Sequence, residues 1–172
     1  EYGISKNPES FASETFRFYF ADKQRGAVLR LSRDGLTPIS DYGMKKYFND
    51  NLEFADTIVG SYDTVKSLYN ISLFHKPDID VDGNPIIVIP QSPSDVPVGN
   101  KVWNVIDFLR LPPTISFRDE NNGWTSFKSF RPETGFSLNN KYYTTKFGEL
   151  WEQHSPVMGR GSNYSRIQRS TI

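Results

Sequence analysis

The sequence has no cysteine, and this absence removes several kinds of chemistry at once. No disulfide can crosslink the fold, and no thiolate can act as a nucleophile or as a metal ligand. A chain of 172 residues must therefore stabilise its fold by burying apolar side chains, and it is long enough to bury a core of useful size.

An excess of charge of either sign is also missing. Twenty Lys and Arg residues balance twenty Asp and Glu residues, so the formal net charge is zero. This balance gives no reason to expect a polyanionic partner, and we predict no specific nucleic-acid site. No apolar run approaches the roughly 20 residues that cross a bilayer, so we also predict no membrane segment.

Catalytic signatures are equally scarce. Two histidines occur, His75 and His154, and both stand beside loop residues, so we interpret them as exposed turn histidines. The sequence contains no nucleophile elbow, no Walker-type phosphate loop and no paired-histidine zinc motif. Glycosidase-type carboxylate pairs need only two acids that meet in space, and sequence alone leaves them open. We predict no enzyme activity, no catalytic residues and no cofactor.

Aromatic residues and turn formers, in contrast, are plentiful. Gly, Pro, Asn, Asp and Ser recur between short alternating segments, which is typical of β proteins. In "TFRFYFA", Phe16, Phe18 and Phe20 fall on one face and Arg17 and Tyr19 on the other, because successive strand side chains point oppositely. This pattern predicts a half-buried strand that buries its aromatic face.

The segments that follow extend this strand into a meander. "AVLRLS" alternates again, with Leu29 and Leu31 on one side and Val28 on the other, and the short "LTPIS" follows the turn "RDG". Pro38 lacks a backbone donor, which favours the edge of a sheet. We therefore predict an antiparallel meander over residues 16–40, with the proline strand outermost.

One helix is predicted after this meander. Met44, Tyr47, Phe48 and Leu52 recur at the three-to-four spacing of a single apolar stripe. Asp41 precedes them, and its carboxylate can accept from the first free amides of a helix. The pattern predicts a short helix capped by Asp41.

A second strand pair follows the helix. "TIVGSY" and "LYNISLF" are joined by the polar reversal "DTVKS", and Tyr69, Ile71 and Leu73 share one face of the second strand. "PIIVIP" is expected to be a short buried strand. "KVWNVIDFLR" suits either a helix or a strand, and its β-branched and aromatic content favours a strand.

Two more hairpins are expected towards the end of the chain. "TISFRD" and "WTSFKSF" flank "ENNG", where Asn122 and Gly123 both tolerate a positive φ. "KYYTTKFGELWEQHS" indicates a hairpin that turns at Phe147 and Gly148. The polar reversals between these strands are the connections that antiparallel sheets use.

The predicted meanders recur about every 40 residues, a spacing typical of propeller blades or of related stacked sheets. We therefore expect a mostly β fold of antiparallel meanders that resemble blades of a β-propeller, with one short helix. Because about four blades are needed to close a propeller, this chain alone is expected not to close one. We expect residues 1–172 to be a single β-rich region of a larger, propeller-like multidomain protein.

One motif suggests a metal ion. In "DIDVDGN", Asp78, Asp80 and Asp82 alternate and Gly83 follows, as in the opening of a calcium-binding loop. The twelfth position of such a loop holds a bidentate Glu, but here it is Ile89. The alternative is a polar β-turn that needs no ion. Sequence alone leaves calcium binding open, and we assign no metal ligand.

Aromatic side chains near the end of the chain suggest a second kind of site. Trp124, Tyr142, Tyr143 and Trp151 can form a sugar platform if they share one open surface. Interleaved aromatic and basic residues can also stack bases, but the zero net charge favours ordinary half-buried strands. The alternative function is thus a receptor- or glycan-binding module.

Three longer segments carry a resemblance to a known family. They are "FYFADKQRGAVLRLSRDGLTPISDYGMKKYF", "IVGSYDTVKSLYNISL" and "GWTSFKSFRPETGFSLNNKYYTTKFGELWEQHS". Together they resemble large structural proteins of tailed bacteriophages, in particular the tail nozzle or "muzzle" proteins of podovirus-like and crAss-like phages. "GWTSFKSFRPETGFSLNNKYYT" is the most specific part, and the resemblance runs from about Thr15 to His154.

The resemblance implies a structural component of the virion tail that is assembled in the host cytoplasm. It implies a protein that forms part of the distal conduit for DNA ejection and that self-associates in a ring with other tail proteins as neighbours. The family implies no catalytic residue that can be transferred to a position of this sequence. The alternative within the same resemblance is a receptor- or glycan-binding propeller module of the tail.

Overall fold

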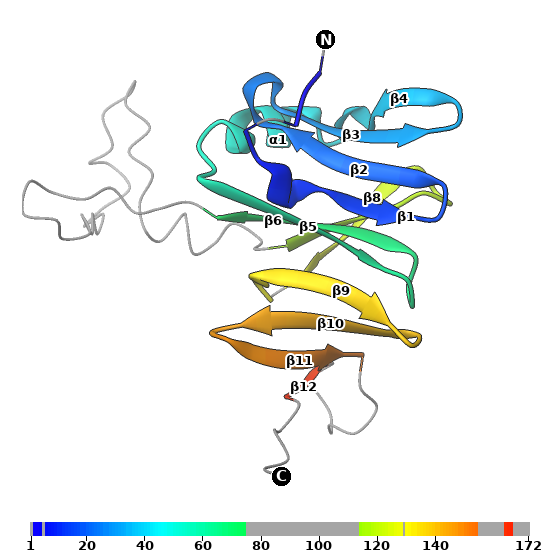
Figure 1. Cartoon of the computed structure of the whole chain (residues 1–172). Coiled ribbons are helices and arrows are strands. Elements are labelled where there is room, and N and C mark those ends of the chain that lie inside the picture. Colours follow the sequence, from blue (N-terminus) through cyan, green and yellow to red (C-terminus); the bar gives the residue numbers. More distant parts are fainter. Residues whose placement is uncertain (1, 5, 75–113, 129, 155–163, 167–172) are drawn as a thin grey trace, which may run out of the picture.

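The computed structural model describes residues 2–4, 6–74, 114–128, 130–154 and 164–166 (Figure 1). The predictions for "PIIVIP" and "KVWNVIDFLR", for His75 and for the calcium candidates Asp78, Asp80 and Asp82 lie outside the described residues. The predicted strands from the other segments all fall inside them.

The fold is mostly β, as predicted, and consists of three four-stranded antiparallel sheets that follow one another along the chain. Each sheet is a meander, because every strand pairs with the next one in sequence. The first sheet contains β1 (Ala12–Glu14), β2 (Arg17–Asp22), β3 (Ala27–Ser32) and β4 (Gly35–Pro38). The second contains β5 (Thr57–Asp63), β6 (Leu68–Phe74), β7 (Thr114–Arg118) and β8 (Gly123–Lys128), and the third contains β9 (Thr134–Leu138), β10 (Lys141–Lys146), β11 (Glu149–Gln153) and β12 (Tyr164–Arg166).

The predicted turns are confirmed. Pro38 lies in β4, at the edge of the first sheet, where its missing backbone donor breaks no ladder. Asn122, in the turn directly before β8, has a φ of 45°. Phe147 and Gly148 form the two-residue turn between β10 and β11 with φ values of 54° and 71°. Two successive positive φ values match the twist of the hairpin strands, which explains this tight connection.

The faces of β2 differ from the prediction. Tyr19 is fully buried, whereas Phe16 is 77% exposed and Phe18 is 42% exposed, so the phenylalanine face points outward. The prediction that this aromatic face is buried is wrong. Alternation shows which residues share a face, but partners in other parts of the chain decide which face is covered.

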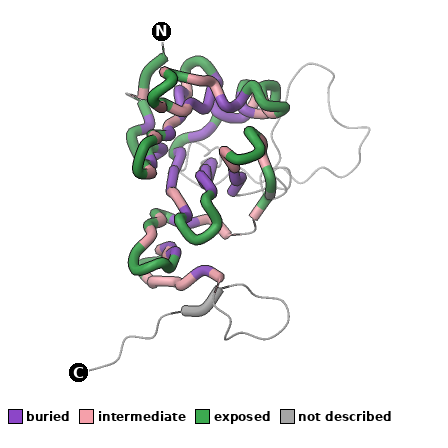
Figure 2. The backbone as a smooth tube through the Cα atoms, turned by 90° about the vertical axis from the view of Figure 1, so that its right-hand side faces the viewer, coloured by how far each residue is buried: buried purple, intermediate pink, exposed green. Residues whose placement is uncertain are grey.

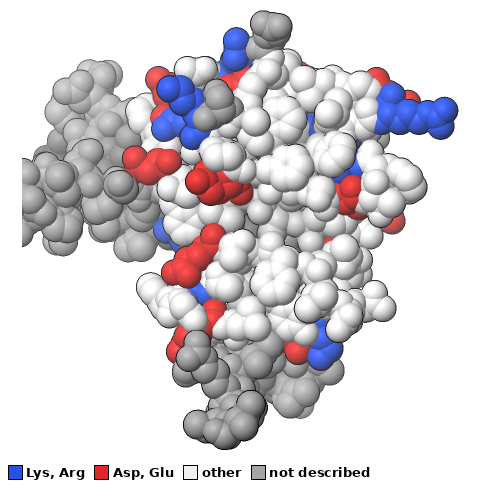
Figure 3. Space-filling view, viewed as in Figure 1, with Lys and Arg blue, Asp and Glu red and all other residues white. Residues whose placement is uncertain are grey.

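The outward face of the first sheet carries exposed apolar side chains. In Figure 3, the surface turned towards the viewer is uncharged over much of its middle, and charged side chains lie mostly towards its edges. Leu31 and Leu36, on the neighbouring strands, are also more than one third exposed. The sheet therefore presents apolar side chains to solvent on this side.

The predicted helix is present as α1 (Lys45–Leu52), but it is not capped by Asp41. Its N-cap is Met44, which makes no side-chain capping bond, and Asp41 ends a preceding 3₁₀ turn. The Asp41 carboxylate lies 3.5 Å from the Lys45 ammonium instead. Shorter 3₁₀ turns are η1 (Pro8–Ser10), η2 (Lys23–Arg25) and η3 (Ile39–Asp41).

The apolar stripe of α1 is confirmed and closes one side of the core. Phe48 and Leu52 are fully buried, and the Phe48 ring lies 4.6 Å from the Trp124 ring of β8. The Trp124 indole N–H donates to the carbonyl oxygen of Ile39 at 3.0 Å. A buried indole needs such an acceptor, so this bond ties β8 to the 3₁₀ turn before the helix.

Aromatic stacking joins the first and second sheets. The Tyr19 ring stacks on the rings of Tyr69 at 4.8 Å and Tyr62 at 5.7 Å. The Tyr69 hydroxyl donates to the carbonyl oxygen of Ser10 at 2.8 Å, and Gly60 lies against that same carbonyl. This contact holds the N-terminal segment against β5.

The sheets are arranged in chain order from top to bottom of Figure 1. The first strands contact one another, since β1 packs against β5 and β5 packs against β9. Figure 2 shows the buried backbone where the sheets meet and the exposed backbone at the loops. The second sheet is therefore the middle layer, with a neighbour on each face.

Candidate functional site

The two faces of the second sheet have opposite character. Tyr69, Ile71, Ile115 and Phe117 belong to the core that it shares with the first sheet and α1. The face turned towards the third sheet is polar although it is buried. Its buried side chains are Ser61, Asp63, Asn70, Ser72, Thr114 and Ser116, and the half-buried Lys128 of β8 joins them.

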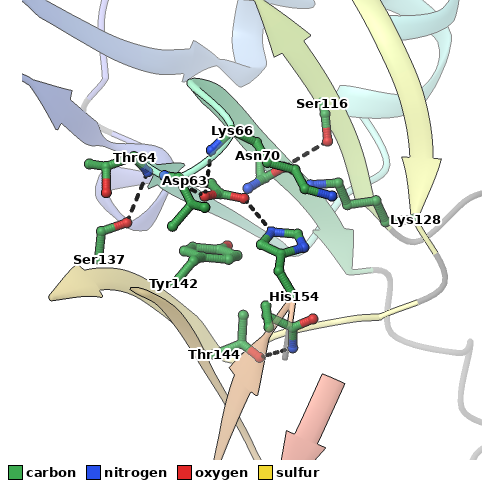
Figure 4. A network of polar contacts seen from close by, with 12 residues as sticks. Asp63, Thr64, Lys66, Asn70, Ser116, Lys128, Ser137, Tyr142, Thr144 and His154 are labelled. Carbon is green, nitrogen blue, oxygen red and sulfur yellow. Dashed lines mark hydrogen bonds and ion pairs between the residues drawn. The ribbon is translucent and has the colours of Figure 1, made fainter. Parts of the chain in front are cut away.

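The third sheet meets this face with polar groups of its own (Figure 4). The hydroxyls of Ser61 and Tyr142 lie 2.7 Å apart. Ser137 accepts from the Thr64 amide at 3.0 Å and donates to the Tyr62 carbonyl at 2.9 Å. We call this region, formed by the second-sheet residues above with Ser137, Tyr142, Thr144, Gln153 and His154, the polar joint.

Asp63 and His154 form the central pair of the polar joint. Asp63 is fully buried and accepts from the amides of Val65 at 2.9 Å and Lys66 at 3.2 Å. Its other carboxylate oxygen lies 2.7 Å from His154 Nε2. Burial pushes the pKa of Asp63 upward, but the hydrogen bond and charge of His154 outweigh this effect, so the pKa lies below its usual value.

This position corrects the sequence interpretation of His154 as an exposed turn residue. Its side chain is only 16% exposed and is paired with a buried carboxylate. In the sequence, Asp63 is the first residue of the polar reversal "DTVKS". An Asp that accepts hydrogen bonds from the amides that follow it is an ordinary turn former. This pattern predicts the turn and does not identify a distant partner.

Lys128 brings a further charge to the polar joint. Its ammonium donates to Asn70 Oδ1 at 2.8 Å, and the Ser116 hydroxyl donates to the same oxygen at 2.7 Å. Burial lowers the pKa of Lys128 to about 8, and the nearby charge of Asp63 opposes this shift only in part. Burial likewise raises the pKa of Tyr142 to about 12.

The chemistry of the polar joint is that of a crosslink between two sheets. In a nucleophilic triad, a carboxylate orients one histidine nitrogen while the other faces a nucleophile. Here Asp63 bonds to His154 Nε2, and His154 Nδ1 is buried with no hydrogen-bond partner among the described residues. The Tyr142 ring lies flat against the His154 ring, with centroids 6.2 Å apart, and its hydroxyl bonds to Ser61.

A second polar cluster joins the first and second sheets. Asp119, in the turn between β7 and β8, accepts from the Tyr19 hydroxyl and lies 2.6 Å from Arg30 and 3.6 Å from Arg17. Burial and the bond to Asp119 raise the pKa of Tyr19. Sequence analysis missed this cluster, because nothing in "FRDENNG" distinguishes Asp119 from an ordinary turn residue.

The four aromatic candidates for a sugar platform do not share one open surface. Tyr142 is fully buried in the polar joint, and the partly buried Trp124 packs against the core beside Phe48. Tyr143 and Trp151 are half-buried and lie on opposite faces of the third sheet, because Trp151 pairs with Thr144. They therefore cannot stack together on one sugar.

Asp63 and His154 line neither of two hollows in the described part of the chain, although Thr144 and Gln153 of the polar joint border the smaller one. A polar surface cleft of about 660 Å³ runs between the N-terminal segment and α1, and a smaller one of about 150 Å³ lies beside the third sheet. Among the described residues, no group of three or more acidic or histidine side chains is placed to hold a metal ion. The cleft is lined by Lys6, Asn7, Lys23, Gln24, Gly26, Asn49, Glu53 and Asp56.

No helix within the described ranges is both long and apolar enough to cross a membrane. Neither a scan of family models nor a search of curated proteins finds a match for this sequence. The geometry of the sheets and their joints is therefore the basis for a functional proposal.

Proposed function

We propose that this chain is a structural component of a bacteriophage tail, in the nozzle or muzzle region that forms the distal conduit for DNA ejection. It works by assembly with its neighbours and not by turning over a substrate. The polar joint is the observation that carries this proposal. Its buried polar side chains bond across two sheets, and its central pair, Asp63 and His154, lines neither of the two hollows described above.

We further propose that the three sheets are neighbouring blades of a propeller-like domain. Blades pack around an axis through their first strands, and the contacts of β5 with both β1 and β9 support such an arrangement. Each sheet is a four-stranded meander, which is the usual blade. Electron microscopy of the assembled particle tests this: we expect sheets radiating from a common axis, and sheets stacked in an open line would contradict it.

We prefer the structural role to the glycan-binding alternative because of where the aromatic residues lie. A sugar platform needs exposed, coplanar rings, but Tyr142 is buried and Trp124 is bonded to Ile39 in the core. An isolated chain is thus expected to show no binding on a glycan array.

The direct test of the function is mass spectrometry of purified particles of the phage that carries the gene, followed by immunogold labelling. We expect the protein in fixed stoichiometry in the particle, with label at the distal end of the tail. A protein made during infection but absent from purified particles would refute the proposal.

A further inference from the structure

The first sheet has an unusual distribution of charged and apolar side chains. In a sheet with one free face, the charged side chains normally point to solvent. Here the guanidinium groups of Arg17 and Arg30 point inward to Asp119, and the opposite face carries Phe18 and Leu31. The face left open is the apolar one.

This open face, which we call the first outer face, is continuous across the strands. Phe18 pairs directly with Leu31, and Leu31 pairs with Leu36, so three apolar side chains form a row across β2, β3 and β4. Their exposed fractions are 42%, 41% and 42%. The Phe11 ring stacks on the Phe18 ring at 5.9 Å, and Phe11 is itself 46% exposed.

The third sheet has a similar open face at the other end of the molecule. Ser137 and Tyr142 bond to the second sheet, so their neighbours Phe136, Leu138 and Tyr143 point away from it. Phe136 stacks on Tyr143 at 5.6 Å and is 41% exposed, and Leu138 is 58% exposed. We call this the second outer face.

We propose that the second outer face of one copy of this chain docks on the first outer face of the next copy, in a head-to-tail contact. This inference rests on the proposed structural role and names the partner that the role requires. The contact continues the internal order, in which each sheet packs its face against that of the following sheet. Clustered exposed apolar side chains of this kind mark interaction surfaces.

Charge supports a second copy as the occupant. The first outer face presents a row of apolar side chains, and the charged residues Lys141 and Glu152 on the second outer face neutralise each other at 3.0 Å. The whole chain has zero net charge, so copies do not repel one another. A head-to-tail contact therefore buries no unpaired charge, and because it is heterologous it repeats into a ring or a filament.

The test uses the full chain, and its lack of cysteine makes engineered thiols unique. A variant with both Leu36→Cys and Leu138→Cys places one thiol on each outer face. Treated with a short bismaleimide crosslinker, it is expected to give a ladder of covalent multimers on a denaturing gel, whereas each single variant is expected to remain uncrosslinked. The control pairs Leu138→Cys with Val65→Cys, which is equally exposed but lies in the β5–β6 turn, and it is expected to give no ladder.

Sedimentation velocity supplies an independent measurement. We expect the unmodified chain to associate as its concentration rises, and Leu31→Lys to weaken association at least ~10-fold, because docking would bury an ammonium group. Circular dichroism checks that this variant is folded. A chain that stays monomeric at every concentration, or single-cysteine variants that crosslink to dimers, would overturn the head-to-tail contact. Neither result would contradict the proposed location in the virion, which mass spectrometry tests separately.

Discussion

Asp119 shows how much a single turn residue contributes to this fold. Its carboxylate is 11% exposed and faces Arg30, whose side chain is 16% exposed, as well as Arg17 and the Tyr19 hydroxyl. Asp119, in the β7–β8 turn of the second sheet, thus bonds to first-sheet residues that are distant from it in sequence. Removing it leaves a largely buried guanidinium without its partner.

We therefore predict that Asp119→Ala lowers the free energy of unfolding by about 3 kcal/mol. The matched control is Lys141→Ala at the Lys141–Glu152 pair, where the Lys side chain is 52% exposed, and the expected loss is much smaller because solvent screens an exposed ion pair. Urea denaturation measures both values. Equal losses in the two variants would contradict the role of Asp119 as a buried partner.

Gly60 illustrates a steric requirement at the residue scale. A Cβ atom at this position would lie 1.9 Å from the carbonyl oxygen of Ser10, which is backbone and cannot swing away. The N-terminal segment packs on β5 only because Gly60 leaves room for it.

The second prediction is that Gly60→Ala destabilises the fold by about 2 kcal/mol or more. Gly123→Ala is the control, since an added Cβ there meets its nearest atom at an ordinary 3.5 Å. We expect that variant to change stability by less than about 0.5 kcal/mol. Thermal and urea unfolding check both, and a neutral Gly60→Ala would show that the segment can move aside.

At the scale of elements, the second sheet is the informative one, because its two faces bind their neighbours by different means. Towards the first sheet it uses aromatic and aliphatic side chains, and towards the third it uses the polar joint. Buried polar groups stabilise a joint only while each keeps its partner. The stability that the polar joint provides should therefore respond to pH.

Lys128 allows the pH response of the polar joint to be measured. Its pKa of about 8 in the fold is below the usual value of about 10.4, so between these two values the unfolded chain binds more protons than the folded chain. Stability attributable to Lys128 therefore rises with pH across this window. We predict a gain on the order of 1–2 kcal/mol from pH 8 to pH 10 relative to Lys128→Met.

The comparison with Lys128→Met is needed because tyrosines titrate in an adjoining pH range. Burial raises the pKa of Tyr142, so above about pH 10 tyrosines lose their protons more readily in the unfolded chain than in the folded one. This lowers the stability of both proteins as the pH rises. Stability curves from urea denaturation at stepped pH give the difference. Parallel curves for the two proteins would mean that Lys128 is not desolvated in the fold.

At the scale of the whole molecule, the two contacts of the second sheet predict an order of opening. Large apolar and aromatic side chains bind the first sheet, whereas hydrogen bonds, each with a net contribution of about 1 kcal/mol, dominate the contact with the third. The third sheet is thus the part that separates first.

Native-state hydrogen exchange tests this order. We expect the amides of β10 and β11 to exchange with an opening free energy at least ~2 kcal/mol below that of β5 and β6. Asp63→Ala should lower the protection of the third sheet further and leave that of β2 and β3 unchanged, because its partner His154 belongs to the third sheet. A single opening free energy for all three sheets would contradict the prediction.

The sequence by itself determined the local structure of the described part. Alternating side chains, Pro38 at a sheet edge, a positive φ at Asn122, the turn at Phe147 and Gly148, and the stripe of α1 all depend on neighbouring residues, and all are confirmed. These features follow from backbone sterics and short-range periodicity, which a single segment contains.

Tertiary structure alone decided which faces are covered and which polar groups meet. Phe18 points to solvent and Tyr19 inward because Tyr69 and Asp119, far along the chain, supply the stacking ring and the acceptor. Asp63 meets His154 for the same reason. Alternation divides a strand into two faces but carries no information about what lies opposite each face, since burial is a property of contacts between distant segments.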